Sequence, residues 1–283
     1  MQLVKRRKDE SRRRRPVLYS KYHDLQERDV NDFILASASI FKWGNLTNKV
    51  IMDVGCGPGN TSSAWFLTLY PAIKRLVAVD ISEGMIHLAK ILNPHPKIEF
   101  MVADISDEST LECWERNFNK VISTWCFHFI KDQTAAFRNI YNLLRPGGEA
   151  AVLFEVSSPY HACYEYIIRS SKWNHLFKNV MDEYSELCVK NFEETYYKQL
   201  LQELGFAVIL CKRKPKNFTF QTDDDCIGYA LAMFPGYKIV PGELMDEFRK
   251  DLFQSFMMYG GREPNGRPVI YYNMMNILVR KAP

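Results

Sequence analysis

The sequence predicts an α/β protein built on a doubly wound, mostly parallel, seven-stranded sheet. Apolar runs of strand length alternate with stretches of helical periodicity through the first half of the chain. A glycine-rich turn, Gly55 to Gly59, directly follows the first apolar run. The first three runs end in or beside Asp53, Asp80 and Asp104. Such strand–turn–helix units bind nucleotides at the carboxyl edge of a Rossmann-like sheet.

The elements of the first half are expected in the following order. The apolar runs predict strands at residues 50–54, 76–79, 98–103, 121–130 and 149–156. An amphipathic helix beginning near Asp24 precedes them, and further helices are expected at about residues 61–70, 82–92, 108–116 and 132–144. The sequence RPGG at 145–148 ends the last of these helices. Right-handed crossovers between the parallel strands then place their carboxyl ends on one edge of the sheet.

The second half of the chain departs from this alternation. Residues 157–194 are rich in aromatic side chains without a strand pattern, and residues 223–259 combine helical periodicity with Pro-Gly turns. Both segments predict a helical cap over the carboxyl edge of the sheet. A helix ending at Gly205 and two further strands, at residues 206–211 and 269–279, would complete the sheet.

Composition describes an ordinary globular protein. Of the 283 residues, 47% are hydrophobic and 25% are charged, which suits one large domain or one domain with a cap. The seven cysteines include no CxxC pair, so neither a zinc site nor a disulfide framework is indicated. The histidines form no HExxH motif, and we expect no bound metal.

The excess of positive charge lies at the amino terminus. Residues 1–15 hold eight basic and two acidic residues, a net charge of +6, so the +4 of the whole chain leaves −2 for the rest. We expect a disordered basic leader over residues 1–17 and one folded domain over residues 18–283. The leader could instead direct nuclear entry or contact RNA or acidic lipid, and we expect no other nucleic-acid contact. No apolar run reaches the length of a membrane span, so the expected location is cytoplasmic.

The spacing of the glycines favours S-adenosylmethionine (SAM) over a dinucleotide. A dinucleotide fingerprint reads GxGxxG, whereas Gly55, Gly57 and Gly59 form GxGxG and are followed by Asn60. Closely spaced glycines let the backbone bend tightly and approach a ligand. Asp53, just before the turn, suits the ammonium group of an amino acid and would repel a pyrophosphate.

The ends of the next two strands extend the same interpretation. Asp80 is placed to accept the two hydroxyls of a ribose, and Ile81 beside it is a further candidate cofactor contact. Asp104 and Ile105 are placed to receive the amino group of adenine and to flank its ring. SAM carries an ammonium group, a ribose and an adenine but no phosphate, so the combined features predict a SAM site.

With these features the chain resembles the class I SAM-dependent methyltransferases over about residues 18–280. Further segments are similar to the arthropod juvenile hormone acid methyltransferase family: LQERD at 25–29, STWCFHFIKDQ at 123–133, NIYNLLRPGGE at 139–149, and the insert with DDCIG at 224–228 and DEF at 246–248. That family uses SAM to methylate the carboxylate of a sesquiterpenoid acid, either farnesoic acid or juvenile hormone acid. The resemblance therefore implies a small carboxylic acid as substrate and a role in juvenile hormone biosynthesis.

The resemblance also implies which residues bind the acid. The family's glutamine near the amino terminus matches Gln26, which is implied to hold the substrate carboxylate. Its His-Trp pair after the fourth strand matches His128 and Phe129, so this chain lacks an indole N–H at the second position. We expect Gln26 and His128 to orient the acid, with Phe127 and Phe129 in the pocket wall. Aromatic residues of the cap would house an apolar tail, with an ordinary aromatic core as the alternative.

The expected reaction needs no general base. A carboxylic acid with a reference pKa of about 4 is ionised at neutral pH and can attack a methyl group directly. The protein has to align the two groups and exclude water. An arginine partner would stabilise the attacking oxygen, so the neutral amide of Gln26 suits this role better.

Three alternatives stay open. The chain could be a SAM-dependent methyltransferase acting on another small acid or on an amine. It could be a non-catalytic SAM-binding protein that its basic leader docks to nucleic acid. A dinucleotide-dependent dehydrogenase is the third alternative, and Asn60 and Asp104 count against it.

Overall fold

The computed structural model describes residues 21–60, 63–177, 193–234 and 236–283. The predicted leader at 1–17 and the part of the first cap segment at 178–192 lie outside the described residues. The chain divides into two compact units. We call the first the sheet unit; it comprises residues 26–155, 192–214 and 274–283. The second, the helical unit, takes in the described residues among 1–25, 156–191 and 215–273.

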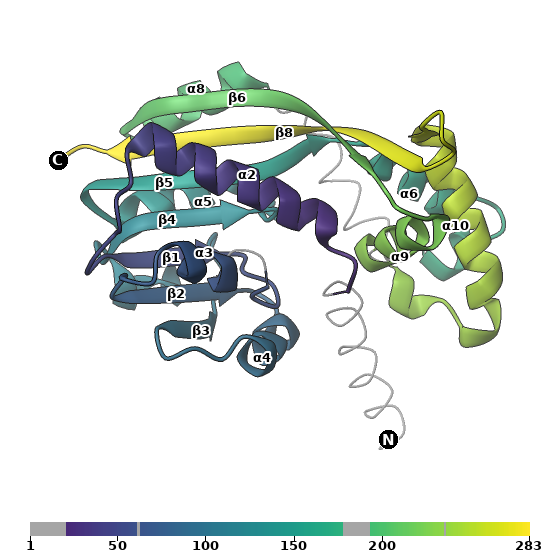
Figure 1. Ribbon diagram of the computed structural model, residues 1–283, viewed down its shortest axis with the longest axis horizontal. Helices are drawn as coiled ribbons and strands as arrows, with labels where there is room; N and C mark the ends of the chain where they lie inside the picture. The colour runs from purple at the N-terminus through teal and green to yellow at the C-terminus, as the bar shows by residue number, and fades with distance from the viewer. Residues whose placement is uncertain (1–20, 61–62, 178–192, 235) are drawn as a thin grey trace. The chain divides into compact units, whose positions relative to one another are not determined.

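The central sheet has the strand order β3-β2-β1-β4-β5-β8-β6. Its strands are β1 (Val50–Val54), β2 (Arg75–Asp80), β3 (Ile98–Val102), β4 (Phe118–Thr124), β5 (Leu144–Ser157), β6 (Phe206–Thr219) and β8 (Pro268–Lys281). Strands β3, β2, β1, β4 and β5 pair in parallel, and β8 runs in the opposite direction (Figure 1). The α/β class and the mostly parallel sheet are therefore confirmed. Among the described residues the sheet has eight strands where seven were expected, because the two-residue β7 (Gly261–Arg262) pairs with β8.

The central parallel strands β1 and β2 are apolar because both of their faces are covered. All five residues of β1 are buried, as are the four central residues of β2. The register pairs Asp53 with Ala78 and Val54 with Val79, so the glycine turn after β1 and Asp80 at the end of β2 meet at one edge. The sheet therefore brings the polar residues that follow these strands to a common edge.

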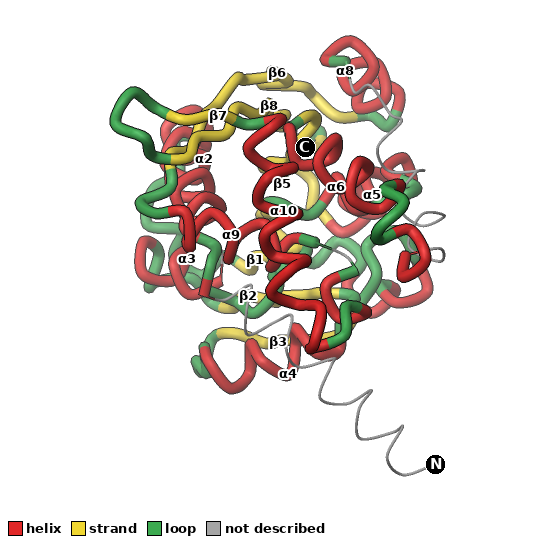
Figure 2. The backbone as a smooth tube through the Cα atoms, turned by 90° about the vertical axis from the view of Figure 1, so that its right-hand side faces the viewer, coloured by secondary structure: helices red, strands yellow, loops and turns green. Residues whose placement is uncertain are grey.

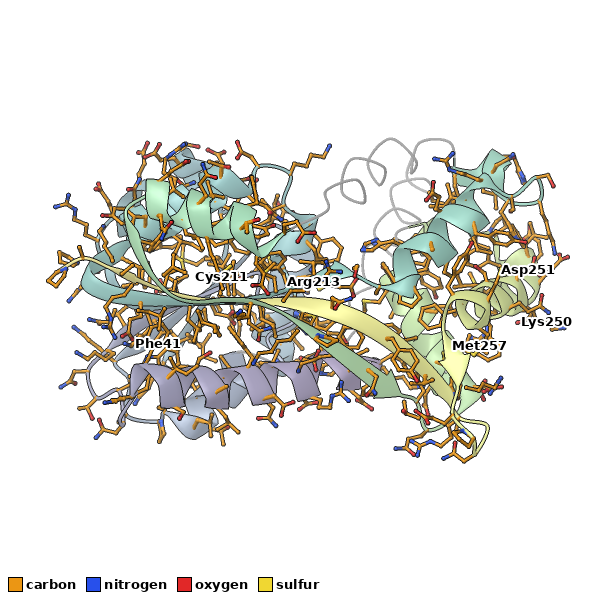
Figure 3. All side chains as sticks on the ribbon, turned by 90° about the horizontal axis from the view of Figure 1, so that it is seen from above. Phe41, Cys211, Arg213, Lys250, Asp251 and Met257 are labelled. Carbon is orange, nitrogen blue, oxygen red and sulfur yellow. The ribbon has the colours of Figure 1, made fainter. Side chains whose placement is uncertain are left out.

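Helices cover the sheet unit on both faces: α2 (Asp24–Phe41), α3 (Ser63–Leu69), α4 (Glu83–Leu92), α5 (Gln133–Leu143) and α8 (Glu194–Glu203). Figures 1 and 3 show α2 on one face of the sheet and α8 on the other. The backbone N–H of Arg213 on β6 donates to Oε1 of Glu194 at 2.8 Å, which ties α8 to its strand. Helix α2 runs back along the sheet, so that its first turn lies at the carboxyl edge and Phe41 at the opposite edge.

Two predicted elements are wrong in the region before α5. The strand expected at 121–130 ends at Thr124, because Trp125 adopts φ 55° and the next residues form the 3-10 helix η3 (Phe127–Phe129). The helix expected at 108–116 is two 3-10 turns, η1 (Glu108–Thr110) and η2 (Glu112–Trp114). Arg116 follows them at φ 52°, a value that a right-handed helix does not allow.

The helical unit is built around α6 (Pro159–Arg169), α9 (Asp223–Met233) and α10 (Met245–Tyr259), which lie together in Figure 2, with 3-10 turns η4 (Tyr237–Ile239) and η5 (Gly242–Leu244). Aromatic rings fill its centre: Phe234 lies 5.0 Å from Tyr164, 5.1 Å from Phe177 and 5.2 Å from Phe248 between ring centroids. These four aromatic residues therefore form the core of the helical unit. An aromatic core was the alternative to a pocket that houses an apolar tail. That the helices cover the carboxyl edge stays a prediction.

Within the described part of the chain, no helix combines the length and the apolar character that crossing a bilayer requires.

Candidate cofactor and acceptor site

The glycine turn folds back onto the end of β2. The backbone N–H groups of Gly55 and Cys56 both donate to the carbonyl oxygen of Val79, at 2.8 and 3.0 Å. Gly55, Gly57 and Gly59 have φ values of 74°, 55° and 78°. Residues with a Cβ rarely adopt these values, so the turn favours glycine at all three positions.

The three glycines differ in what lies beside them. A Cβ added to Gly55 would lie 2.3 Å from Sγ of Cys126, and one added to Gly59 would lie 3.0 Å from the ring of Phe100. A Cβ added to Gly57 would meet no atom within 4 Å. Gly55 and Gly59 are therefore packed against protein, while the space beside Gly57 is open to a ligand.

Asp80 holds the turn with one oxygen and the start of α4 with the other. Its Oδ2 accepts the N–H of Gly57 at 2.9 Å, and its Oδ1 accepts the N–H of Ser82 at 2.8 Å. Burial raises the pKa of Asp80, and these two hydrogen bonds oppose the rise. An ionised carboxylate has about four acceptor positions, so Asp80 retains capacity for two ribose hydroxyls.

The charges of the three strand-end carboxylates all act on one thiol, that of Cys126. Burial raises the pKa of Cys126, and the nearby charges of Asp80, Asp53 and Asp104 raise it further. Asp53 is buried within β1, and Asp104 uses Oδ1 to accept the N–H and the hydroxyl of Ser106, at 2.8 and 2.7 Å. A set of carboxylates accepts hydrogen bonds, attracts cations and repels phosphate. The ammonium, hydroxyl and amino groups of SAM fit this set.

The two isoleucines predicted to contact the cofactor differ in exposure. Ile81 is 68% exposed, which leaves its side chain free to pack against a ligand. Ile105 is only 4% exposed, and its carbonyl oxygen accepts a hydrogen bond from the side-chain amide of Asn139 at 2.8 Å. Ile81 is therefore the better candidate for a ring contact.

Phe127, predicted in the wall of the acid pocket, instead has a fully buried side chain in the core of the sheet unit. Its ring centroid lies 4.6 Å from that of Phe137 and 5.9 Å from that of Phe154. Phe127 therefore anchors η3, whereas His128 is half-buried and Phe129 is 52% exposed.

The first turn of α2, which lies at the carboxyl edge of the sheet in Figure 1, contains Gln26, and the Gln26 side chain is 1% exposed. Its element thus brings it to the same edge as the glycine turn. Gln26, His128 and Phe129 remain the proposed acid-binding residues.

Three further residues of this edge had no assigned role in the sequence interpretation. Cys126 packs on Gly55, and Trp125 precedes it at φ 55°. The side-chain amide of Asn93, at the end of α4, donates to the carbonyl oxygen of Pro58 at 2.8 Å and to Oδ1 of Asn60 at 3.1 Å. Cys126 and Trp125 lie in the segment at 123–133 that is similar to the juvenile hormone acid methyltransferase family, and this similarity could have indicated a role for them. No motif or spacing in the sequence indicates a role for Asn93.

No group of three or more histidine, cysteine, aspartate or glutamate side chains that could hold a metal ion occurs among the residues that the structure describes.

Replacing Asp80 with asparagine is expected to weaken SAM binding by about 1.5–3 kcal/mol, because the hydroxyls and the turn lose a charged acceptor. Titration calorimetry measures this directly. The matched control is Asp107→Asn, because Asp107 is an exposed acid whose Oδ1 accepts the N–H and the hydroxyl of Ser109, at 3.0 and 2.7 Å. Its SAM affinity should change by less than about 0.5 kcal/mol. Equal affinities of Asp80→Asn and the wild type would remove Asp80 from the cofactor site.

Comparison with known proteins gives a family model described as "Methyltransferase domain", which matches residues 52–152. The chain is 26% identical to the juvenile hormone acid O-methyltransferase of Drosophila melanogaster, over 94% of this chain and 92% of that protein. It is 29% identical to the juvenile hormone acid O-methyltransferase of Bombyx mori, over 83% of each chain. Among solved structures, the fold is similar to phosphoethanolamine N-methyltransferase 2 of Haemonchus contortus in complex with S-adenosyl-L-methionine. That match has a TM-score of 0.50 and 15% identity, and it covers 88% of this chain and 52% of that chain.

Proposed function

Because this chain is a class I SAM-dependent methyltransferase that resembles the juvenile hormone acid O-methyltransferases, we propose that it methylates the carboxylate of a small apolar, sesquiterpenoid-like acid. The observation that carries the proposal is the similarity to two enzymes of that name along more than four fifths of the chain. Farnesoic acid and juvenile hormone acid are the first substrates to test, and juvenile hormone biosynthesis is the process in which such a product belongs.

The cofactor would be held by the groups that meet at the carboxyl edge. Asp53 would receive the ammonium group, Asp80 the ribose hydroxyls and Asp104 the adenine amino group, with the open space beside Gly57 admitting the ligand. When bound, SAM supplies a methyl group on a positively charged sulfur. Ile81, being exposed beside Asp80, would cover part of the adenosine.

The acid would be held by neutral or weakly basic donors. Gln26 would orient the carboxylate through its neutral amide, and because its side chain is almost completely buried, the surrounding protein would keep water away from that amide. His128 can donate a second hydrogen bond from its imidazole. An ionised carboxylate needs no proton removed, so the chain has to supply alignment and a dry site, not a base.

Replacing Gln26 with alanine is expected to lower kcat/KM for the acid by about tenfold or more, since the carboxylate loses a buried hydrogen-bond donor. SAM affinity should stay within about twofold, because Gln26 is assigned to the acid and not to the cofactor. Gln199→Ala is the matched control, since Gln199 is an exposed helical glutamine whose amide donates to Glu203. Turnover of Gln26→Ala equal to that of the control would exclude Gln26 from the acid site.

A panel of acceptors tests the substrate class itself. Purified protein and SAM labelled in the methyl group would be offered farnesoic acid, a short aliphatic acid, a dicarboxylic acid and the amine that corresponds to farnesoic acid. We expect the label in the product of farnesoic acid above all others. Preference for the short acid or the dicarboxylic acid would overturn the sesquiterpenoid-like substrate, and preference for the amine would overturn carboxylate methylation.

A further inference from the structure

We propose that Trp125 is a positioning residue of the acid site, whose strained backbone places its indole so that it fixes the orientation of the His128 imidazole. This inference rests on the proposed function, because it takes His128 as a group that meets the acid.

The backbone of Trp125 is strained at the point where β4 ends. Its φ of 55° lies in the left-handed region, which a large aromatic residue seldom occupies. The strand pairing nevertheless continues up to this residue, since Thr124 is in register with Leu153 and the N–H of Trp125 donates to the carbonyl oxygen of Leu153 at 2.8 Å. The turn is therefore made at a single residue, between a paired strand and η3.

The residues that follow hold Trp125 in this conformation. Cys126 fits against Gly55, where no Cβ stands in its way, and Phe127 is buried in the core. The side-chain amide of Gln133 donates to the carbonyl oxygen of Phe127 at 2.7 Å, and the hydroxyl of Tyr197 donates to Oε1 of Gln133. Strained conformations persist where the surroundings determine them in this way, and they gather at functional sites.

The strain brings the indole against the imidazole. The ring centroids of Trp125 and His128 are 6.0 Å apart with an interplanar angle of 89°, and those of His128 and Phe129 are 4.1 Å apart at 51°. Edge-to-face contacts of this kind are favourable and directional. The imidazole of His128 thus contacts two aromatic rings, that of Trp125 before it in the sequence and that of Phe129 after it. The orientation of the imidazole decides where its N–H points.

A glycine at position 125 would make the same turn without strain. The chain instead has tryptophan, the largest side chain, at this strained position. We therefore infer that the indole ring has a role of its own. Its contact with His128 supplies one.

Trp125→Gly tests the proposal because it releases the strain and removes the ring together. We expect a folded protein whose SAM affinity stays within about twofold of the wild type. We expect kcat/KM for the acid to fall by about ten- to a hundredfold, the effect of a misplaced reacting group. The control is Arg116→Gly, since Arg116 has φ 52° and precedes the same strand that Trp125 follows. Its kcat/KM should not change.

Trp125→Phe and Trp125→Leu separate the ring from the backbone. Both variants keep a side chain with a Cβ on the strained backbone of position 125, and only phenylalanine keeps an aromatic ring there. We therefore expect Trp125→Phe to retain most of the wild-type activity and Trp125→Leu to lose it. This pair also carries the test if Trp125→Gly does not fold.

Four results would overturn the proposal. One is wild-type kcat/KM in Trp125→Gly. Another is a loss of turnover matched by an equal loss of SAM affinity, which would assign Trp125 to the support of Cys126 and the glycine turn. Equal activity of the phenylalanine and leucine variants is the third. A wild-type protein that methylates no acid rejects the proposed function and this inference together, whereas an active wild type with an equally active Trp125→Gly rejects the inference alone.

Discussion

Replacing Glu149 with alanine is expected to lower the free energy of unfolding by about 3–5 kcal/mol, the usual effect of removing one partner from a buried ion pair. The Glu149 side chain is 6% exposed. Its Oε2 accepts the indole N–H of Trp43 at 2.7 Å and a hydrogen bond from the ammonium of Lys120, and its Oε1 accepts from the guanidinium of Arg280 at 2.7 Å. Without Glu149, a largely buried ammonium group loses its counter-ion.

The pH dependence of this loss follows from the pKa of Glu149. Burial by itself would raise that pKa, but hydrogen bonds from Lys120, Trp43 and Arg280 bring it below its usual value. A carboxyl group with a lowered pKa stabilises the folded state fully above its unfolded pKa of about 4.3, and the stabilisation disappears as the pH falls through the folded pKa. The difference in the free energy of unfolding between the wild type and Glu149→Gln, measured with urea, should therefore shrink below about pH 4.

Glu99→Ala is the matched control for Glu149. Glu99 forms an ion pair with Arg75 at 3.2 Å, but its side chain is 47% exposed. Exposed pairs contribute about 0–1 kcal/mol, so this variant should unfold almost like the wild type. Equal losses in Glu149→Ala and Glu99→Ala would show that the cluster around Glu149 is no more stabilising than a surface pair.

Gly55→Ala is expected to abolish measurable SAM binding and to lower the free energy of unfolding by about 2–5 kcal/mol, from backbone strain and overpacking together. Alanine would have to adopt φ 74°, and its Cβ would lie 2.3 Å from Sγ and 2.4 Å from Cβ of Cys126. Thermal melts and calorimetry with SAM measure the two effects.

Two further variants separate the collision from the strain. Gly57→Ala also places alanine at a positive φ, but its Cβ meets nothing within 4 Å, so it should lose less stability than Gly55→Ala. Adding Cys126→Gly to Gly55→Ala removes the colliding side chain and should recover part of the lost stability. If Gly55→Ala and Gly57→Ala melt at the same temperature, the contact with Cys126 does not constrain the turn.

The sheet was predictable where local pattern and burial agree. Strands β1 and β2 are buried on both faces and appear as continuous apolar runs, and Ser82 and Asp132 cap the helices that were expected after them. By contrast, β6 was expected to end at Cys211 but extends to Thr219. The last part of this strand was missed because its basic residues and Pro215 resemble a loop in the sequence.

The carboxylates of the candidate site could be predicted from the sequence, whereas the strained turn at Trp125 could not. Asp53, Asp80 and Asp104 are readable because each stands at a strand end. The end of β4 was missed because the apolar residues after Thr124 continue a strand pattern, and only the packing of Cys126 and Phe127 reveals that the backbone turns at Trp125. The cluster around Glu149 was also missed, since Trp43 and Arg280 are 106 and 131 residues away in sequence.

The most direct test of the central claim is the chemical identity of the product formed from farnesoic acid and SAM. The glycine turn with its three carboxylates, together with Gln26 and His128, predicts transfer of one methyl group to the carboxylate. Mass spectrometry should therefore show a methyl ester that mild alkaline hydrolysis returns to the starting acid. A methylated product that resists alkali, or no methylated product in the presence of bound SAM, would contradict the account.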